Sequence, residues 1–122
     1  MVHTLQLFDY CVAVDTLGAE LVRFEKNSLN YLWNKAIPFW QRQAPVLFPI
    51  VGKLKNGKYL YQGTEYYLPQ HGFARDRDFE LVGQTPESLL FRLDDNKHPG
   101  YPFEFELYIG YFLSIDGLKV TY

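Results

Sequence analysis

The chain has 122 residues, the size of one domain or of part of one, and its 48% hydrophobic residues suffice for a packed core, which excludes a disordered class. A net charge of −2, with scattered Lys and Arg, excludes the basic stripe that binds a nucleic-acid backbone. The single cysteine, Cys11, excludes an internal disulfide framework, and the N-terminal residues show neither a signal peptide nor a membrane-spanning run. We therefore expect a cytoplasmic protein without a nucleic-acid or membrane partner.

The first third of the chain alternates apolar and polar residues with a period of two, which predicts strands over 5–14 and 18–24 and a short one over 29–33. The segment 38–49 follows, with three prolines in twelve residues. Proline cannot donate a hydrogen bond to a neighbouring strand, so this segment is predicted to be irregular.

Two hairpins are predicted in the middle of the chain. Asn56-Gly57 is a strong turn signal because both residues tolerate a positive φ. After it, 58–61 and 64–68 form one predicted hairpin, and 78–83 and 88–93 form another.

The clearest predicted strand covers 103–113 and is followed by an Asp116-Gly117 turn. Its odd positions are all apolar and are expected to face the core, whereas Glu104 and Glu106 lie on the opposite face. Those two carboxylates fit either acid–base chemistry or a solvated strand face. Short strands separated by turns, with no helical periodicity, predict an all-β antiparallel sandwich.

The chain stops within a strand pattern at residues 120–122, without a closing turn. We expect it to be the front part of a larger sheet with an unpaired strand edge that favours self-association; a naturally occurring edge strand is the alternative.

Aromatic residues make up 18% of the chain, with ten Tyr and ten Phe. Such rings fill half-buried strand surfaces, and they also stack against the C–H faces of sugars. The composition fits both interpretations.

His71 is the histidine most suggestive of a site. It lies between the two hairpins, after Pro69 and before Gly72, and Arg75 follows four residues later. A His and an Arg together can bind sugar hydroxyls or a phosphate, although a loop His beside an Arg is also common in purely structural roles. No spacing of His, Cys or carboxylates resembles a metal site, and no glycine-rich loop suggests a nucleotide, so no cofactor is expected.

Three segments together resemble the aldose 1-epimerase (galactose mutarotase)-like family, in its bacterial mutarotase-related branch. They are 17–21 (LGAEL), 44–54 (APVLFPIVGKL, running into NGKY) and 68–76 (LPQHGFARD). Their order and spacing also match, so the whole chain, 1–122, resembles the N-terminal portion of one such domain.

The resemblance implies a large β-sandwich with a sugar cleft on one concave face, and an enzyme that interconverts the α and β anomers of an aldose. In that reaction a glutamate removes the proton of the anomeric hydroxyl and a histidine protonates the ring oxygen, so that the ring opens. The family's acidic histidine lies in a Gly-Gly-His-Pro type of segment, which this chain does not contain. We therefore expect the catalytic pair downstream of Tyr122, and we do not assign His98 to it.

The same resemblance implies three substrate-binding residues, His71, Lys53 and Arg75. Lys53 stands where the family usually has an Arg, which replaces a planar fork of donors with a point charge. The expected partner is a small aldose or its phosphorylated form. The alternative from another functional class is a non-catalytic carbohydrate-binding module on the same fold.

Overall fold

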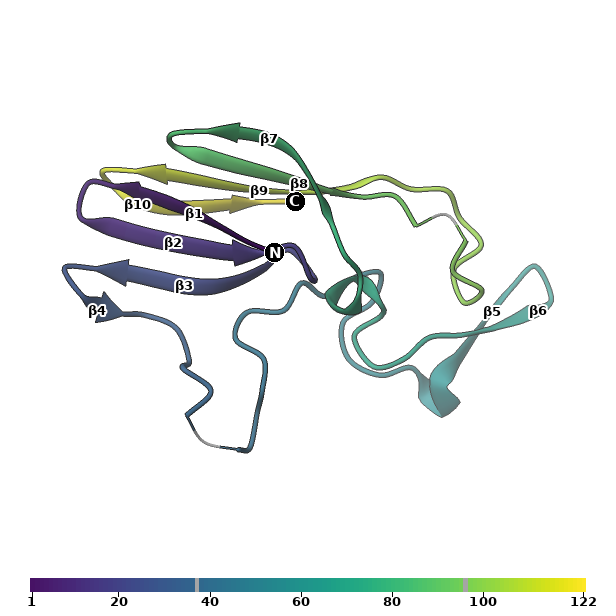
Figure 1. Ribbon diagram of the computed structural model, residues 1–122. Helices are drawn as coiled ribbons and strands as arrows, with labels where there is room; N and C mark the ends of the chain where they lie inside the picture. The colour runs from purple at the N-terminus through teal and green to yellow at the C-terminus, as the bar shows by residue number, and fades with distance from the viewer. Residues whose placement is uncertain (37, 96) are drawn as a thin grey trace.

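The computed structural model, which describes residues 1–36, 38–95 and 97–122, consists mainly of two antiparallel four-stranded sheets (Figure 1). The first sheet has the order β1-β2-β3-β4, with β1 (Val2–Leu7), β2 (Tyr10–Asp15), β3 (Glu20–Lys26) and β4 (Leu29–Asn30). The second has the order β10-β9-β8-β7, with β7 (Glu80–Thr85), β8 (Ser88–Leu93), β9 (Leu107–Ser114) and β10 (Gly117–Thr121). The predicted all-β antiparallel class is confirmed.

The core lies between these two sheets. Its largest fully buried side chains come from β2, β8 and β9, namely Val12, Val14, Leu89, Phe91 and Ile109. The hydroxyl of Tyr111 on β9 donates a 2.6 Å hydrogen bond to the carbonyl of Ala19, just before β3, and so ties the layers together. Burial of this hydroxyl raises the pKa of Tyr111.

A smaller hairpin of β5 (Lys58–Tyr61) and β6 (Thr64–Tyr67) projects from the stacked sheets, on the side where the 97–106 loop also lies (Figure 1). Two 3₁₀ turns flank it, η1 (Lys55–Gly57) and η2 (Ala74–Asp76), and no α-helix occurs in the described ranges. In η1, Asn56 and Gly57 have φ values of 57° and 70°, as the turn signal predicted. Both predicted hairpins, around 62–63 and around 85–87, are confirmed.

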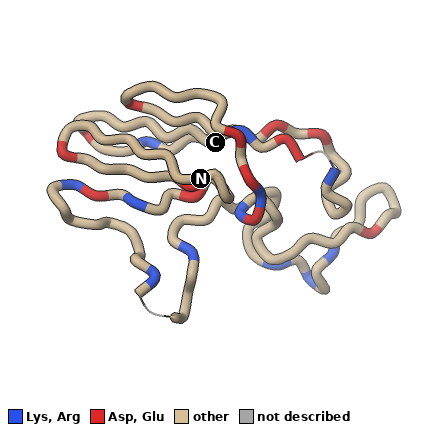
Figure 2. The backbone as a smooth tube through the Cα atoms, viewed as in Figure 1, with Lys and Arg blue, Asp and Glu red and all other residues tan. Residues whose placement is uncertain are grey.

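Acidic and basic residues are spread over the sheets and the loops (Figure 2). Some form short-range pairs, such as Arg23 with Glu25 at 2.6 Å and Lys58 with Glu65 at 2.5 Å. Because these pairs are exposed, they contribute little to stability.

The prediction of one strand over 5–14 is wrong, since the segment is the β1–β2 hairpin. Phe8 and Asp9 form its turn with φ values of 51° and 65°. The first turn position holds Phe8, where Gly or Asn would signal a turn. Because a bulky aromatic residue rarely adopts a left-handed conformation, this turn could not be predicted from its first residue. Before this turn the core-facing apolar residues stand at odd positions, Leu5 and Leu7, and after it they stand at even positions. This change in the alternation marks the turn in the sequence.

Two other strands are also shorter than predicted. The third strand, expected over 29–33, is only β4, because the Asn30 side chain accepts a hydrogen bond from Leu32 N–H and turns the backbone. The long strand expected over 103–113 begins only at Leu107. The rings of Phe103 and Phe105 pack instead into an aromatic cluster beside it. Within β9 the predicted facing is confirmed, with Ile109, Tyr111 and Leu113 buried.

Candidate functional site

The 68–76 segment is fixed by a close approach of two backbones. Gly72 pairs with Phe48 in a parallel bridge, and the N–H groups of Phe73 and Ala74 both donate to the Phe48 carbonyl, at 2.9 and 3.2 Å. A Cβ at Gly72 would lie 2.1 Å from that carbonyl oxygen, and the residue has a φ of 72°. Only glycine meets both conditions.

His71 is held by the 38–57 region through the same contact. Its backbone N–H donates to the Gly52 carbonyl at 2.8 Å, and its ring Nδ1 accepts a hydrogen bond from Gly52 N–H, also at 2.8 Å. With Nδ1 accepting, the neutral ring carries its proton on Nε2. The ring is half-buried, and its Nε2 lies 3.4 Å from the Gln70 side-chain nitrogen. In the orientation shown both are donors, so Nε2–H remains available to an oxygen acceptor.

Lys53 follows directly after Gly52, so its backbone adjoins the contact that holds His71, and its side chain is exposed. That Lys53 points toward a bound sugar remains a prediction.

Arg75 lies in η2 and reaches back over the same segment. Its Nη2 donates to the carbonyl of Gln70 at 2.9 Å, whereas its Nε is buried and has no hydrogen-bond partner among the residues described. The nearest carboxylate oxygen to Nε, Asp76 Oδ2, is 3.9 Å away, beyond hydrogen-bond distance. Asp78, two residues further on, forms a backbone bridge with Leu17.

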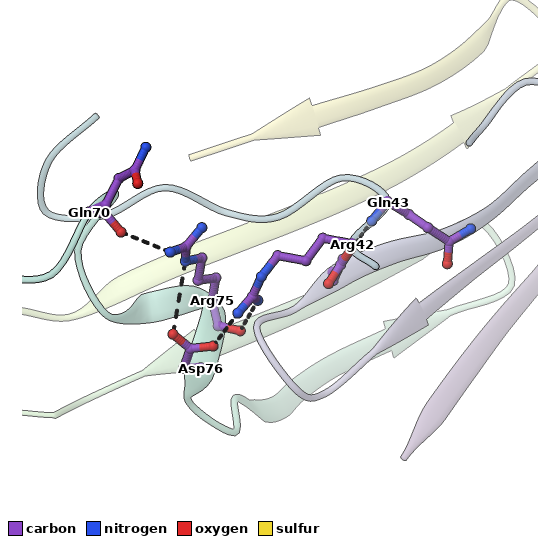
Figure 3. Close-up of polar contacts among 6 residues, drawn as sticks. Arg42, Gln43, Gln70, Arg75 and Asp76 are labelled. Carbon is purple, nitrogen blue, oxygen red and sulfur yellow. Dashed lines mark hydrogen bonds and ion pairs between the residues drawn. The ribbon is translucent and has the colours of Figure 1, made fainter. Parts of the chain in front are cut away.

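Arg42 is the residue of this region that the sequence did not reveal. Figure 3 shows Asp76 between the guanidinium groups of Arg42 and Arg75. Arg42 donates from Nη1 to the Arg75 carbonyl at 3.2 Å and from Nη2 to Asp76 Oδ1 at 2.5 Å. Arg42 lies in the irregular 38–49 segment, 33 residues before Arg75, so no local motif could connect them.

A buried carboxylate anchors the segment that carries Arg42. Glu20 is 8% exposed, and its Oε1 accepts hydrogen bonds from the backbone N–H groups of Gln43 and Ala44, at 2.5 and 3.1 Å. The Gln43 side-chain amide donates to the carbonyls of Val22 and Trp33. The segment is therefore held to β3 both by its backbone N–H groups and by the Gln43 side chain.

Aromatic rings pack behind the 68–76 segment. Phe73 contacts Phe48 and Tyr101, and the ring of His98 stacks on Phe73 with centroids 4.1 Å apart. Burial, and then the nearby charge of Arg77, lowers the pKa of His98. An apolar cavity of about 150 Å³ adjoins this cluster, lined by residues that include Pro49, Tyr59, Leu68 and Phe103. His98 therefore takes part in the packing of this cluster.

Other parts of the described chain show fewer features of a binding site. Glu106, one of the two carboxylates singled out on the long strand, lies 3.7 Å from Arg92 and accepts a hydrogen bond from Tyr108. A larger polar hollow of about 560 Å³ lies at the β1–β2 and β3–β4 turns, away from the 68–76 segment. In residues 1–36, 38–95 and 97–122, no three His, Cys, Asp or Glu side chains gather to hold a metal ion. Within the same ranges, no helix is long and apolar enough to cross a membrane.

Comparison with known proteins gives consistent results. The family model described as aldose 1-epimerase matches residues 1–122. LacX, the plasmid-encoded protein of Lactococcus lactis subsp. lactis, is 32% identical over 119 residues, which cover 91% of this chain and 40% of LacX. The uncharacterised protein YihR of Escherichia coli K12 is 29% identical, with 92% and 40% covered. The chain thus spans about 40% of the length of these curated relatives.

Solved structures show the same relation. A galactose mutarotase related enzyme from Lactobacillus acidophilus superposes with a TM-score of 0.92 at 41% identity, covering 97% of this chain and 41% of that one. A galactose mutarotase-like protein from Lactobacillus casei gives a TM-score of 0.94 at 31% identity, covering 98% and 42%.

Proposed function

Because the chain belongs to the aldose 1-epimerase family over all its 122 residues, we propose that its 68–76 segment binds a free aldose for the interconversion of the α and β anomers. The chain spans about 40% of its relatives' length, so the activity of the whole protein is part of this proposal. The proposed location is the cytoplasm, which a single cysteine fits.

The geometry of His71 carries the proposal. Its ring is fixed at Nδ1 by Gly52 N–H and is half-buried, with Nε2–H free to donate to a sugar oxygen. A positioned donor on a rigid backbone contact is what selective binding of a hydroxylated ligand needs, because the ordering cost is already met before binding.

Two cations complete the proposed site. Arg75 offers guanidinium donors beside His71, and Lys53 adds a mobile point charge next to Gly52. Either can donate to sugar hydroxyls, and both would favour a phosphorylated aldose over a neutral one.

In this proposal the acid and base of ring opening come from outside residues 1–122. The described contacts of His71 are to Gly52 and Gln70, and none is to a carboxylate. Ring opening requires a paired acid and base, each of which contributes roughly 10²–10⁴-fold in rate. The same observation favours the second candidate, a carbohydrate-binding module without catalysis.

A hybrid protein distinguishes the two. In the Lactobacillus acidophilus relative, the matching N-terminal portion is replaced by residues 1–122, and anomer exchange of D-galactose and D-glucose is followed by polarimetry. The isomerase proposal predicts exchange well above the spontaneous rate, and a large loss of kcat/KM on His71→Ala. Binding of sugar without exchange would favour the binding module, and absence of both would contradict the proposal.

The isolated 122 residues are expected to bind sugar without accelerating exchange. If they do accelerate it, the acid and base must be sought among His71, His98, Glu104 and Glu106.

A further inference from the structure

We propose that Arg42 is a positioning residue of the sugar site, which holds Asp76 away from Arg75 so that the Arg75 guanidinium stays open to a ligand oxygen. The inference rests on the proposed function, since Arg75 counts as a site residue only if the 68–76 segment binds an aldose.

Arg42 contacts both the backbone and the counter-ion of its neighbour. Its Nη1 donates a hydrogen bond to the Arg75 carbonyl at 3.2 Å, and its Nη2 donates one to Asp76 Oδ1 at 2.5 Å. A guanidinium presents its donors in a rigid fork, so one side chain fixes the two acceptors relative to each other. Arg42 thereby sets the orientation of the Asp76 carboxylate (Figure 3).

Asp76 would otherwise compete for Arg75. Its second oxygen, Oδ2, lies 3.9 Å from Arg75 Nε, and that nitrogen is buried without a hydrogen-bond partner among the described residues. The Asp76 side chain is 56% exposed, and its Oδ1 is held by the hydrogen bond from Arg42. A carboxylate and a guanidinium that meet without a competitor form a close, two-bond pair. Without Arg42, Asp76 should close onto Arg75 Nε and turn the guanidinium, so that its other nitrogens no longer keep the orientation in which we propose they meet a sugar oxygen.

The hold on Arg42 is itself built into the fold. The next two residues, Gln43 and Ala44, donate their N–H groups to the buried Glu20 carboxylate, and the Gln43 side chain bonds Trp33 and Val22. The backbone from which Arg42 extends therefore cannot drift from β3, although Arg42 is itself only half-buried. These contacts limit the movement of the backbone that carries Arg42, as a positioning role requires.

The first experiment needs no sugar. The Nε–Hε signal of Arg75 is followed by ¹H–¹⁵N NMR in the 122-residue chain, assigned through its loss in Arg75→Lys. In Arg42→Ala, Hε should move downfield as Asp76 accepts it, and the double variant Arg42→Ala/Asp76→Asn should return it to the wild-type position. Arg42→Gln, which removes the charge but keeps a long polar side chain, gives the same reading where the alanine variant does not fold. An unmoved signal, or one that Asp76→Asn does not restore, would overturn the proposal.

The second experiment measures dissociation constants for D-galactose, D-glucose and their 6-phosphates by NMR titration. We expect Arg42→Ala to weaken binding roughly two- to fivefold, the range of an exposed ion pair, and Asp76→Asn to restore it in the double variant. Arg23→Ala, which removes another exposed ion pair that contacts neither Arg42 nor Asp76, should leave binding unchanged. Equal affinity of wild type and Arg42→Ala would overturn the proposal. If the wild type binds none of these sugars, the proposed function fails, while the Arg75 signal still decides whether Arg42 controls Asp76.

Discussion

Gly72 is the position at which the candidate site tolerates the least change. It combines a φ of 72° with a backbone approach that leaves 2.1 Å for a Cβ in front of the Phe48 carbonyl. Both conditions follow from the parallel bridge that carries His71 to Gly52. A substitution here should therefore affect the site and the stability together.

We predict that Gly72→Ala lowers the free energy of unfolding by at least about 2 kcal/mol, since strain at a left-handed residue costs about 1–3 kcal/mol before any clash. Urea unfolding followed by tyrosine fluorescence measures it. Gly57→Ala is the matched control, because Gly57 has a φ of 70° but no atom within 4 Å of its Cβ position. Equal losses in the two variants would show that the approach to Phe48 contributes nothing.

His98 gives the molecule a pH dependence of predictable sign. Burial lowers its pKa below the ordinary value of 6.5, so the unfolded chain binds this proton at a higher pH than the folded chain does. The free energy of unfolding should fall as the pH drops below about 6.5. His98→Asn keeps an acceptor for Gly100 N–H without a titrating ring.

We predict a shallower loss of stability for His98→Asn than for the wild type between about pH 7.5 and 5.5, a range that brackets the ordinary His pKa. Urea midpoints at each pH provide the comparison. Parallel curves would mean that His98 titrates alike in both states.

At the level of single residues, one continuous motif led to the prediction of His71 and Arg75, and both side chains are held by contacts of the 68–76 segment. Their roles in sugar binding remain predictions. The sequence did not predict Arg42 or Glu20. Their partners lie 23 to 34 residues away, and neither contact leaves a periodic or spaced signal. Only the path of the 38–49 segment across β3 brings them together.

Among the elements, hairpins with recognisable turns were predicted correctly and strand limits were not. Asn56-Gly57 and Gln62-Gly63 indicate β5 and β6, because glycine is common where φ is positive. The β1–β2 turn at Phe8 and Asp9 lacks that chemistry. Phe105 continues the apolar alternation of β9, but its ring packs against Phe48, and this tertiary contact overrides the local pattern.

The 38–49 segment is held to β3 by the Glu20 side chain. Glu20→Ala removes the acceptor of two backbone N–H groups. We predict a loss of about 1–3 kcal/mol in the free energy of unfolding, the cost of leaving buried donors unsatisfied, and faster proteolytic cleavage within this segment. Glu25→Ala in the same strand removes only an exposed pair with Arg23 and should change neither. Identical behaviour of the two variants would contradict the anchoring role of Glu20.

For the whole molecule, the exposed edge of the second sheet is the main liability. Among the strands that the structure describes, β10 pairs with β9 alone, at one end of the β10-β9-β8-β7 order. Tyr108 and Phe112 are exposed on the outer face of β9. Open strand edges beside apolar surface template pairing with other chains.

We predict that the chain self-associates, with a scattering mass that rises above 14.4 kDa with concentration in size-exclusion chromatography with light scattering. Phe112→Glu, which places an acid opposite Lys119 in the register of the sheet, should shift the population toward the monomer. A constant monomer mass across concentrations would count against the prediction.

The central claim is that these 122 residues carry an aldose site built on His71, and a titration of the ¹⁵N-labelled chain with D-galactose, D-glucose and their 6-phosphates tests it most directly. The amide signals of Gly52, Gly72 and Arg75 should shift saturably with at least one sugar. His71→Ala should weaken that binding by roughly ten- to a hundredfold, the loss of one positioned hydrogen bond in a partly buried site, while Gly57→Ala leaves it unchanged. Signals that do not shift with any of the sugars, or that shift equally in wild type and His71→Ala, would contradict the claim.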